Sequence, residues 1–257
     1  MRLDNLTIGY GNHIVQRGLN FATLGGEMVC MLGTNGCGKS TLLRTLAGLQ
    51  PALGGRCLLD DGRDVSTLSE KERAKLFAVV LTERLSAENT TVEDVTAMGR
   101  YPYSGWLGAL NEDDRRIITE ALEQTGMAYK RSWFFNELSD GEKQRVLISK
   151  ALAQQTPYVF LDEPTAHLDL PNRIKTLLFL RKMAHKTGRC VVISTHELDL
   201  ALQTADIIWL MTPGEGVAVG TPKELVTNGD FQHAFSDPHF RFEEAGGALR
   251  IQISESL

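Results

Sequence analysis

"GTNGCGKST", residues 33–41, follows the apolar run "EMVCML" at 27–32 and opens a segment with helical periodicity that ends near Gly48. Glycines in such a loop let backbone N–H groups converge on an anion, and the N-terminus of the following helix adds to the attraction. Lys39 would reach the β- and γ-phosphates of a nucleoside triphosphate, and Ser40 would hold Mg²⁺. An ordinary glycine-rich turn is the simpler alternative, but strand, loop and helix follow here in the order that a phosphate-binding loop requires. The stretch predicts a P-loop in an α/β fold.

Four further apolar runs indicate the sheet that would carry this loop. They are "AVVL" (78–81), "YVFL" (158–161), "CVVIS" (190–194) and "DIIWLM" (206–211), and helical segments separate them. Continuous apolar strands are typical of a mainly parallel sheet that is covered on both faces. Shorter runs predict a small antiparallel β layer beside this sheet, and they lie at 2–9, 19–24 and 55–60. We therefore expect one α/β domain over residues 1–257.

Two regions depart from the alternation of strand and helix. Residues 85–150 show no clear strand and predict a helical subdomain inserted into the α/β body. Within it, "NEDDRRIITEALEQTGMA" opens on Asn111 and three acids, and its apolar residues share one face, as in a capped amphipathic helix. The tail at 237–257 contains "FRFEEAGGALRIQI", which alternates around a Gly-Gly pair and predicts a β-hairpin.

Composition excludes several functional classes. The 32 acids outnumber the 27 lysines and arginines, so nucleic acid is not the expected partner. The four cysteines are at 30, 37, 57 and 190 and form no C-x-x-C pair, which favours reduced thiols over a disulfide or zinc framework. Met1 leads directly into "RLDNLTIGY", so no signal peptide is expected. No apolar run reaches the roughly 18–20 residues that span a bilayer. A membrane role would therefore depend on a partner.

Acidic residues and a histidine end two of the predicted strands. In "YVFLDE" (158–163), Asp162 would complete the Mg²⁺ shell and Glu163 would orient or deprotonate a water. In "VISTHE", His196 would reach the same edge of the sheet, where ligands bind in open α/β folds. The simpler alternatives are a solvated strand end and a structural histidine. The P-loop on the neighbouring strand favours the catalytic interpretation of all three.

"LSDGEKQ", residues 138–144, predicts the start of a helix. Ser139 can cap it, and Glu142 can reach back to the cap amide in a capping box. Capping alone does not explain Asp140 and Gly141, which give up helix propensity in the first turn.

The ordered set of motifs resembles the ATP-binding subunit of an ABC transporter, a P-loop NTPase. The set consists of the P-loop, "LSDGEKQ", "YVFLDE", "AHLD" (166–169) and "STHE" (194–197), and it covers essentially the whole chain. Within that superfamily, "TVEDVTAMGRYPY" (91–103), "LDLALQTADIIWLM" and "GTPKEL" resemble importers of iron-siderophore, haem and cobalamin complexes.

The resemblance implies a head-to-tail homodimer with two composite sites for ATP and Mg²⁺. Ser139, Gly141 and the amides that open their helix would cap the γ-phosphate held by Lys39 of the other subunit. Glu163, His196 and Lys39 would be the catalytic residues, and Tyr10 would stack on adenine. The nucleotide-binding set would comprise Tyr10, Gly33, Asn35, Gly36, Cys37, Gly38, Lys39, Ser40, Thr41, Ser139, Gly141, Glu142 and Asp169.

The resemblance also implies a polytopic membrane permease as partner, bound through region 84–107. A solute-binding protein would act indirectly, and the chain would lie at the cytoplasmic face of the membrane. The aromatic residues of "GRYPY" with Trp106 and Leu107 would help form the docking groove, and core packing is the alternative for them. A soluble ABC ATPase outside transport, of the iron–sulfur cluster assembly type, and a non-hydrolysing interaction module are the competing functions.

Two positions depart from the family pattern. Asp140 stands where the signature has Gly, and Glu83 stands where the family has a Gln whose amide approaches Mg²⁺. Glu83 is therefore a candidate metal ligand together with Ser40 and Asp162, and its charge would strengthen metal binding. Cys37, beside Lys39 at a helix N-terminus, is in a setting that lowers a thiol pKa, and the simpler alternative is a small residue that only fills space.

Overall fold

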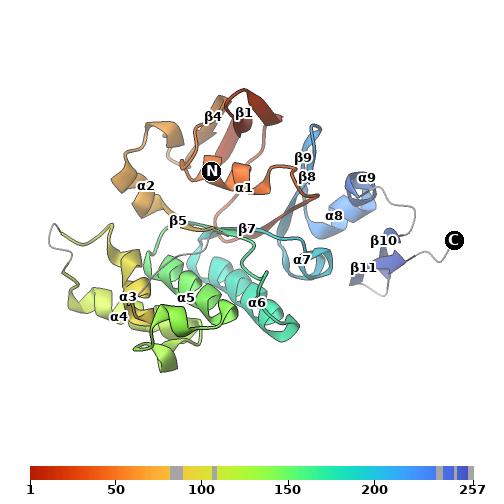
Figure 1. The fold of residues 1–257 in the computed structure, drawn as a ribbon. Helices are drawn as coiled ribbons and strands as arrows, with labels where there is room; N and C mark the ends of the chain where they lie inside the picture. Colours follow the sequence, from red (N-terminus) through yellow and green to blue (C-terminus); the bar gives the residue numbers. More distant parts are fainter. Residues whose placement is uncertain (82–88, 106–108, 236–239, 246–247, 254–257) are drawn as a thin grey trace.

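A six-stranded, mostly parallel sheet forms the centre of the molecule (Figure 1). The structure is a computed structural model that describes residues 1–81, 89–105, 109–235, 240–245 and 248–253. In spatial order the strands are β5 (Phe77–Val80), β6 (Tyr158–Asp162), β7 (Cys190–Ser194), β3 (Met28–Gly33), β8 (Ile207–Thr212) and β9 (Gly216–Gly220). The first five are parallel to one another, and β9 pairs antiparallel with β8. The α/β fold with a mainly parallel sheet is confirmed.

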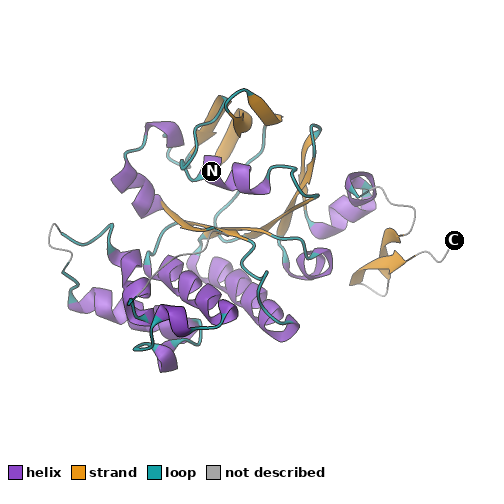
Figure 2. Ribbon diagram, viewed as in Figure 1, coloured by secondary structure: helices purple, strands orange, loops and turns teal. Residues whose placement is uncertain are grey.

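A three-stranded antiparallel sheet lies above the central one (Figure 2). It consists of β2 (His13–Leu19), β1 (Arg2–Tyr10) and β4 (Gly54–Leu58). The segment predicted as a strand at 19–24 joins this layer with other bounds, because the regular strand β2 ends at Leu19 and the N–H of Leu3 donates to the Phe21 carbonyl beyond it. Tyr10 pairs with His13 across Gly11 and Asn12, so a tight hairpin commits 13–19 to pairing with β1. Of the residues after β2, Ala22 makes an isolated bridge to Arg2.

Helices cover both faces of the central sheet, as continuous apolar strands require. Along β3, Met28, Cys30 and Leu32 pack in one core cluster with α5 (Asp140–Ala153) and α6 (Leu170–Thr187). The alternate residues Val29 and Met31 pack on the other face with α1 (Lys39–Leu46) and the antiparallel sheet. Figure 2 shows these layers, with α1 between the two sheets. The P-loop helix is therefore held between two hydrophobic surfaces.

The regular elements that the structure describes between β5 and β6 are all helices, and turns join them. They are α3 (Val92–Ala97), α4 (Glu112–Gln124) and α5, with the short 3-10 turns η2 (Met98–Arg100), η3 (Ala128–Lys130) and η4 (Phe135–Glu137). A third core cluster, which includes Val95, Ile118, Leu122 and Val146, joins the three α-helices. Asn111 caps α4 in a capping box with Asp114, as its sequence predicts.

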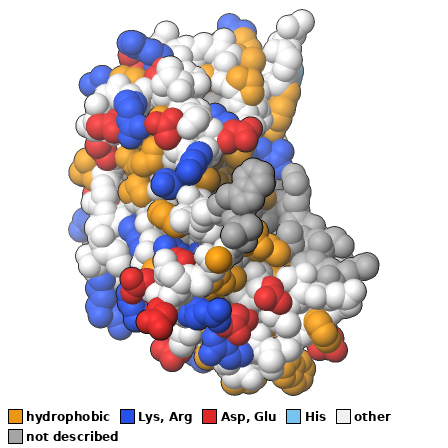
Figure 3. All heavy atoms as spheres, turned by 90° about the vertical axis from the view of Figure 1, so that its left-hand side faces the viewer, with side chains coloured by type: hydrophobic (Ala, Val, Ile, Leu, Met, Phe, Trp, Pro, Cys, Tyr) orange, Lys and Arg blue, Asp and Glu red, His pale blue; other side chains and the backbone are white. Residues whose placement is uncertain are grey.

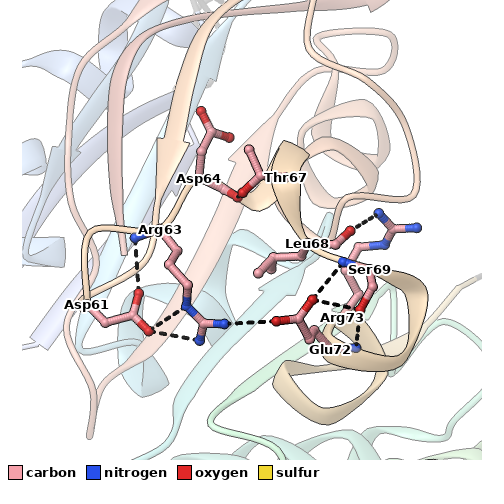
Figure 4. A network of polar contacts seen from close by, with 8 residues as sticks. All are labelled: Asp61, Arg63, Asp64, Thr67, Leu68, Ser69, Glu72 and Arg73. Carbon is pink, nitrogen blue, oxygen red and sulfur yellow. Dashed lines mark hydrogen bonds and ion pairs between the residues drawn. The ribbon is translucent and has the colours of Figure 1, made fainter.

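An ionic network fastens α2 (Glu70–Leu76), the helix that leads into β5 (Figure 4). The guanidinium of Arg63 binds Asp61 at 2.8 Å and Glu72 at 3.3 Å. Glu72 in turn accepts the N–H of Ser69 in the capping box that starts α2. The preceding turn, η1 (Val65–Thr67), is capped by Asp64.

The C-terminal elements are α7 (Leu198–Thr204), α8 (Pro222–Thr227), α9 (Asp230–Ala234) and the paired strands β10 (Phe240–Ala245) and β11 (Ala248–Ile253). Phe231 of α9 and Phe242 of β10 pack with ring centroids 4.9 Å apart. In the part of the chain that the structure describes, no helix is long and apolar enough to cross a membrane.

Candidate functional site

The P-loop joins the end of β3 to the start of α1, and its glycines are sterically required. The backbone φ is +151° at Gly33 and +107° at Gly38, where side chains are rarely tolerated. A Cβ at Gly33 would lie 2.4 Å from the Met211 carbonyl oxygen, and one at Gly38 would lie 2.5 Å from Val15 Cγ1. At Gly36, with φ of +81°, a Cβ would meet no atom within 4 Å, so backbone conformation alone favours glycine there. Asn35 is exposed near the tip of the loop.

Lys39 is the first residue of α1, and its ammonium lies inside the loop. Lys39 is only 7% exposed. Its Nζ donates to the carbonyl oxygens of Gly33 at 2.8 Å and Thr34 at 3.3 Å. A buried cation at a helix N-terminus makes the loop attractive to a phosphate group.

The structure corrects the sequence prediction for the pKa of the Cys37 thiol. The thiol is 1% exposed, and burial raises its pKa above the ordinary value even though Lys39 acts in the opposite direction. Lys39 Nζ lies 3.9 Å from the sulfur. The predicted lowering of the pKa is wrong, because the cost of placing a thiolate out of water exceeds the attraction of the ammonium.

Tyr10 lies beside the P-loop helix. Its hydroxyl is 2.5 Å from Oγ1 of Thr41, while half of the Tyr10 surface stays exposed. The hydrogen bond to α1 anchors the ring at its hydroxyl end, so the aromatic face remains accessible next to the loop that would hold the phosphates.

Asp162 ends β6 beside Ser194, the last residue of β7, and Glu163 directly follows the strand. Ser194 Oγ donates to Asp162 Oδ1 at 2.5 Å and accepts the backbone N–H of Glu163 at 2.9 Å. Asp162 is 2% exposed. Asp162 pairs with Ser194 across the parallel strands, and Ser194 pairs with Met31 of β3, so both carboxylates lie at the edge of the sheet where the P-loop begins.

Glu163 and His196 form a pair at the same edge. Glu163 Oε1 is 2.5 Å from His196 Nε2, and both side chains are partly exposed. Glu163 has a φ of +51°, an uncommon conformation for a residue with a side chain and one that is often found at functional sites. Glu197, which follows His196 in the chain, binds Arg173 at 3.2 Å and accepts a hydrogen bond from Thr165 at 3.2 Å.

Ser139 and Glu142 form the predicted capping box at the start of α5. Glu142 accepts the N–H of Ser139 at 3.0 Å and binds Lys130 Nζ at 2.7 Å. The Lys130 ammonium lowers the pKa of Glu142 to about 2, against the effect of burial and with help from the Ser139 N–H. A Cβ on Gly141 would lie 3.0 Å from Leu168 Cδ2, so the first turn of α5 packs closely on the loop that follows Glu163.

The candidate site residues form two groups in this chain. Within the described residues, no hydrogen bond or ion pair connects Ser139, Gly141 or Glu142 to the P-loop. Asp169 is an exposed N-cap of α6, where it accepts the N–H of Asn172 at 3.2 Å. Asp140 is exposed, with Lys143 Nζ 3.9 Å from its carboxylate. Glu83, Trp106 and Leu107 lie outside the described residues.

Ser194 and Lys130 are contacts that sequence reasoning missed. Ser194 carried a signal, since it is the polar residue that ends the apolar run "CVVIS" one strand away from Asp162. Lys130 carried none, because its pairing with Glu142 depends on how the turn before α5 folds back.

The residues present fit a divalent cation. Asp162 Oδ2 is buried and has no hydrogen-bond partner, and a buried, unpaired carboxylate oxygen is the hard ligand that Mg²⁺ prefers. Among the described residues, no three His, Cys, Asp or Glu side chains converge to hold a metal alone. Ser40 at the start of α1 and the phosphates of a nucleotide would supply the other ligands, as is usual for Mg²⁺.

The P-loop follows β3, and the carboxylates of Asp162 and Glu163 lie at the end of β6, which is separated from β3 by β7. This arrangement in a parallel sheet is that of a P-loop ATPase. The family model "ABC transporter" matches residues 16–166. The probable siderophore transport system ATP-binding protein YusV of Bacillus subtilis is 36% identical over 91% of this chain and 84% of its own length. The ferric enterobactin transport ATP-binding protein FepC of Escherichia coli is 34% identical over 88% and 83%.

A solved dimeric ATP-binding cassette, bound to ADP and Pi in a post-hydrolysis state, is similar in structure. Its TM-score is 0.74 at 27% identity, and the match covers 86% of this chain and 98% of the other. The chain belongs to the ABC transporter family, and it is an ATP-binding ABC ATPase.

Proposed function

We propose that the chain is the ATP-hydrolysing subunit that powers import of an iron chelate, such as a siderophore or haem complex, or of cobalamin. It would act at the cytoplasmic face of the membrane on a polytopic permease, which receives cargo from a solute-binding protein. The names of the siderophore and enterobactin relatives support this cargo class. The competing function, a soluble ABC ATPase outside transport, has no comparable support.

The chemistry follows from the charges at the edge of the sheet. Lys39 and the loop amides would bind the β- and γ-phosphates, and Ser40 and Asp162 would hold Mg²⁺. The cation, when bound, would neutralise charge on the phosphates. Glu163 would orient the attacking water and accept its proton, since its carboxylate is partly exposed. His196, which contacts Glu163 Oε1, would keep that carboxylate in place and lie close to the γ-phosphate.

The second half of each ATP site would come from a second subunit. The single observation that carries this proposal is the separation of the α5 start from the P-loop of the same chain. α5 has 14 residues, begins directly after its N-cap Ser139 and carries a glycine in its first turn. Such an N-terminus attracts anions, and in a head-to-tail dimer Ser139 and Gly141 would cap a phosphate bound by the partner.

Mixing two inactive variants tests the composite site. Ser139→Arg and Lys39→Ala homodimers should each hydrolyse ATP poorly, because every site lacks one half. A mixed dimer would contain one intact site, formed by the Lys39 of one subunit and the Ser139 of the other. Since random mixing places half of the chains in mixed dimers, about a quarter of the wild-type rate should return.

The same measurement can contradict the proposal. If the Ser139→Arg homodimer hydrolysed ATP at the wild-type rate, Ser139 would have no part in the site. If the mixture hydrolysed ATP no faster than the two variants do separately, Ser139 and Lys39 of the same subunit would act in the same site.

A further inference from the structure

Among the residues that the structure describes, Ser194 is the one hydroxyl that hydrogen-bonds to both Asp162 and Glu163. It is fully buried as the last residue of β7. Its Oγ lies 2.5 Å from Asp162 Oδ1 and 2.9 Å from the N–H of Glu163. Chemistry fixes the direction of both bonds, because a backbone N–H only donates and an ionised carboxylate only accepts. The Ser194 hydroxyl therefore donates its proton to a hydrogen bond with the Asp162 carboxylate, and its oxygen accepts the backbone N–H of Glu163.

The first bond decides which oxygen of Asp162 is free. Oδ1 is occupied by Ser194, whereas Oδ2 is buried without a hydrogen-bond partner. A carboxylate that is held at one oxygen cannot turn about its side-chain bond without breaking that hydrogen bond. The orientation of the free oxygen is thus set before any cation arrives.

The second bond supports an uncommon backbone conformation. Glu163 has a φ of +51°, and residues with side chains keep such a conformation only where their surroundings enforce it. The N–H of Glu163 is held by Ser194, and its carbonyl accepts the N–H of Ala166 at 3.2 Å. This conformation places the Glu163 carboxylate against His196.

We propose that Ser194 is a positioning residue for ATP hydrolysis, which directs one oxygen of Asp162 to the cation and holds Glu163 against His196. The inference rests on the proposed function, because it needs Asp162 to be a metal ligand. In this role Ser194 would not itself be a ligand of the metal or the nucleotide. It acts through the two carboxylates.

Direct metal binding tests the inference without relying on activity. Free Mn²⁺ is measured by electron paramagnetic resonance in the presence of the protein and a non-hydrolysable ATP analogue. Ser194→Ala should raise the Mn²⁺ dissociation constant about tenfold, the usual effect of removing a group that orients a metal ligand. Nucleotide binding in EDTA should be unchanged, since the P-loop is intact.

Ser149→Ala is the matched control. Ser149 is also fully buried, and its hydroxyl bonds to the Arg145 carbonyl at 2.9 Å and to Thr125 at 2.6 Å. This variant should lose similar thermal stability while Mn²⁺ binding stays at the wild-type value. Ser194→Cys keeps the shape of the site and replaces a strong donor with a weak one, so it should weaken Mn²⁺ binding even if the alanine variant folds poorly.

The outcomes separate the two proposals. If Asp162→Asn binds Mn²⁺ as the wild type does, the metal role of Asp162 fails and the inference about Ser194 falls with it. If Asp162→Asn loses the metal while Ser194→Ala and Ser194→Cys retain it, only the role of Ser194 is wrong. A tenfold loss that Ser149→Ala shares would be a general effect of stability and would also overturn it.

Discussion

At the scale of the residue, Cys37 shows that burial and a neighbouring charge oppose each other in the P-loop. Lys39 would favour the thiolate, but the sulfur is almost completely shielded from water, and its pKa is raised. The other three cysteines are buried as well. All four thiols are therefore in environments that disfavour reaction.

Thiol labelling checks this conclusion. In the native protein at pH 7, Cys37 should react with iodoacetamide at least about tenfold more slowly than in the unfolded chain, because only an exposed thiolate is a good nucleophile. Mass spectrometry of the peptide that contains Cys37 gives the rate, and Cys37→Ser confirms the assignment. Rapid labelling at neutral pH that bound ATP prevents would contradict the raised pKa.

At the scale of the element, the start of α5 depends on residues outside the helix. Lys130 contacts Glu142 at 2.7 Å and also lies 4.1 Å from the ring centroid of Trp133. Tyr129 donates to the same carboxylate at 3.3 Å. The turn before the helix thus holds Glu142 ionised, and Glu142 holds the N–H of Ser139.

Titration of the Glu142 carboxyl by NMR tests this coupling. The folded pKa of about 2 lies below the ordinary value of 4.5, so the stability that the pair contributes is complete above pH 4.5 and lost as the pH falls through 2. In Lys130→Met the midpoint should rise toward this ordinary value of 4.5, and the free energy of unfolding should become less dependent on pH between these limits. Lys143→Met is the control, since Lys143 lies beside Asp140 instead. An unshifted midpoint in Lys130→Met would mean that the cap amide alone holds the charge.

At the scale of the whole molecule, the segment "GRYPY" connects the surface to the interior of the helical region. Arg100 binds Asp114 at 2.8 Å in a nearly buried ion pair and donates to the Ala153 carbonyl at the end of α5. Tyr103 lies against the Arg100 guanidinium and donates to the carbonyl of Gln154 at 2.8 Å. Tyr101, by contrast, is 59% exposed. Figure 3 shows exposed hydrophobic side chains among charges of both signs on the face at the left of Figure 1.

The two tyrosines should therefore respond differently to a charge. Tyr101→Glu should keep the melting temperature and the ATP affinity of the isolated subunit but weaken co-purification with the permease that we propose as its partner. Tyr103→Glu should lower the free energy of unfolding by about 1–3 kcal/mol, because the hydrogen bond to Gln154 and the ring contact with Arg100 are lost. Tyr101→Phe is the control for both. Unchanged co-purification of Tyr101→Glu would exclude this surface as the permease site, and the predicted role of Trp106 remains a prediction.

The sequence by itself determined the features that depend on neighbours along the chain. The caps at Asn111 and Ser139 and the apolar strands of the central sheet were predicted correctly. These features follow from capping geometry and periodicity, which act over a few residues. Together with the ordered motifs that resemble the ABC family, they were enough to predict the P-loop fold and its ATPase class.

Only the tertiary structure decided the features that depend on register and burial. Ser194 meets Asp162 because β6 and β7 are parallel neighbours in one register. The pKa of Cys37 rises because the surrounding chain excludes water from it. Tyr103 is anchored because α5 ends beneath it. Each of these contacts and the raised pKa depend on residues that are distant in sequence. The local sequence pattern around a residue therefore does not predict them.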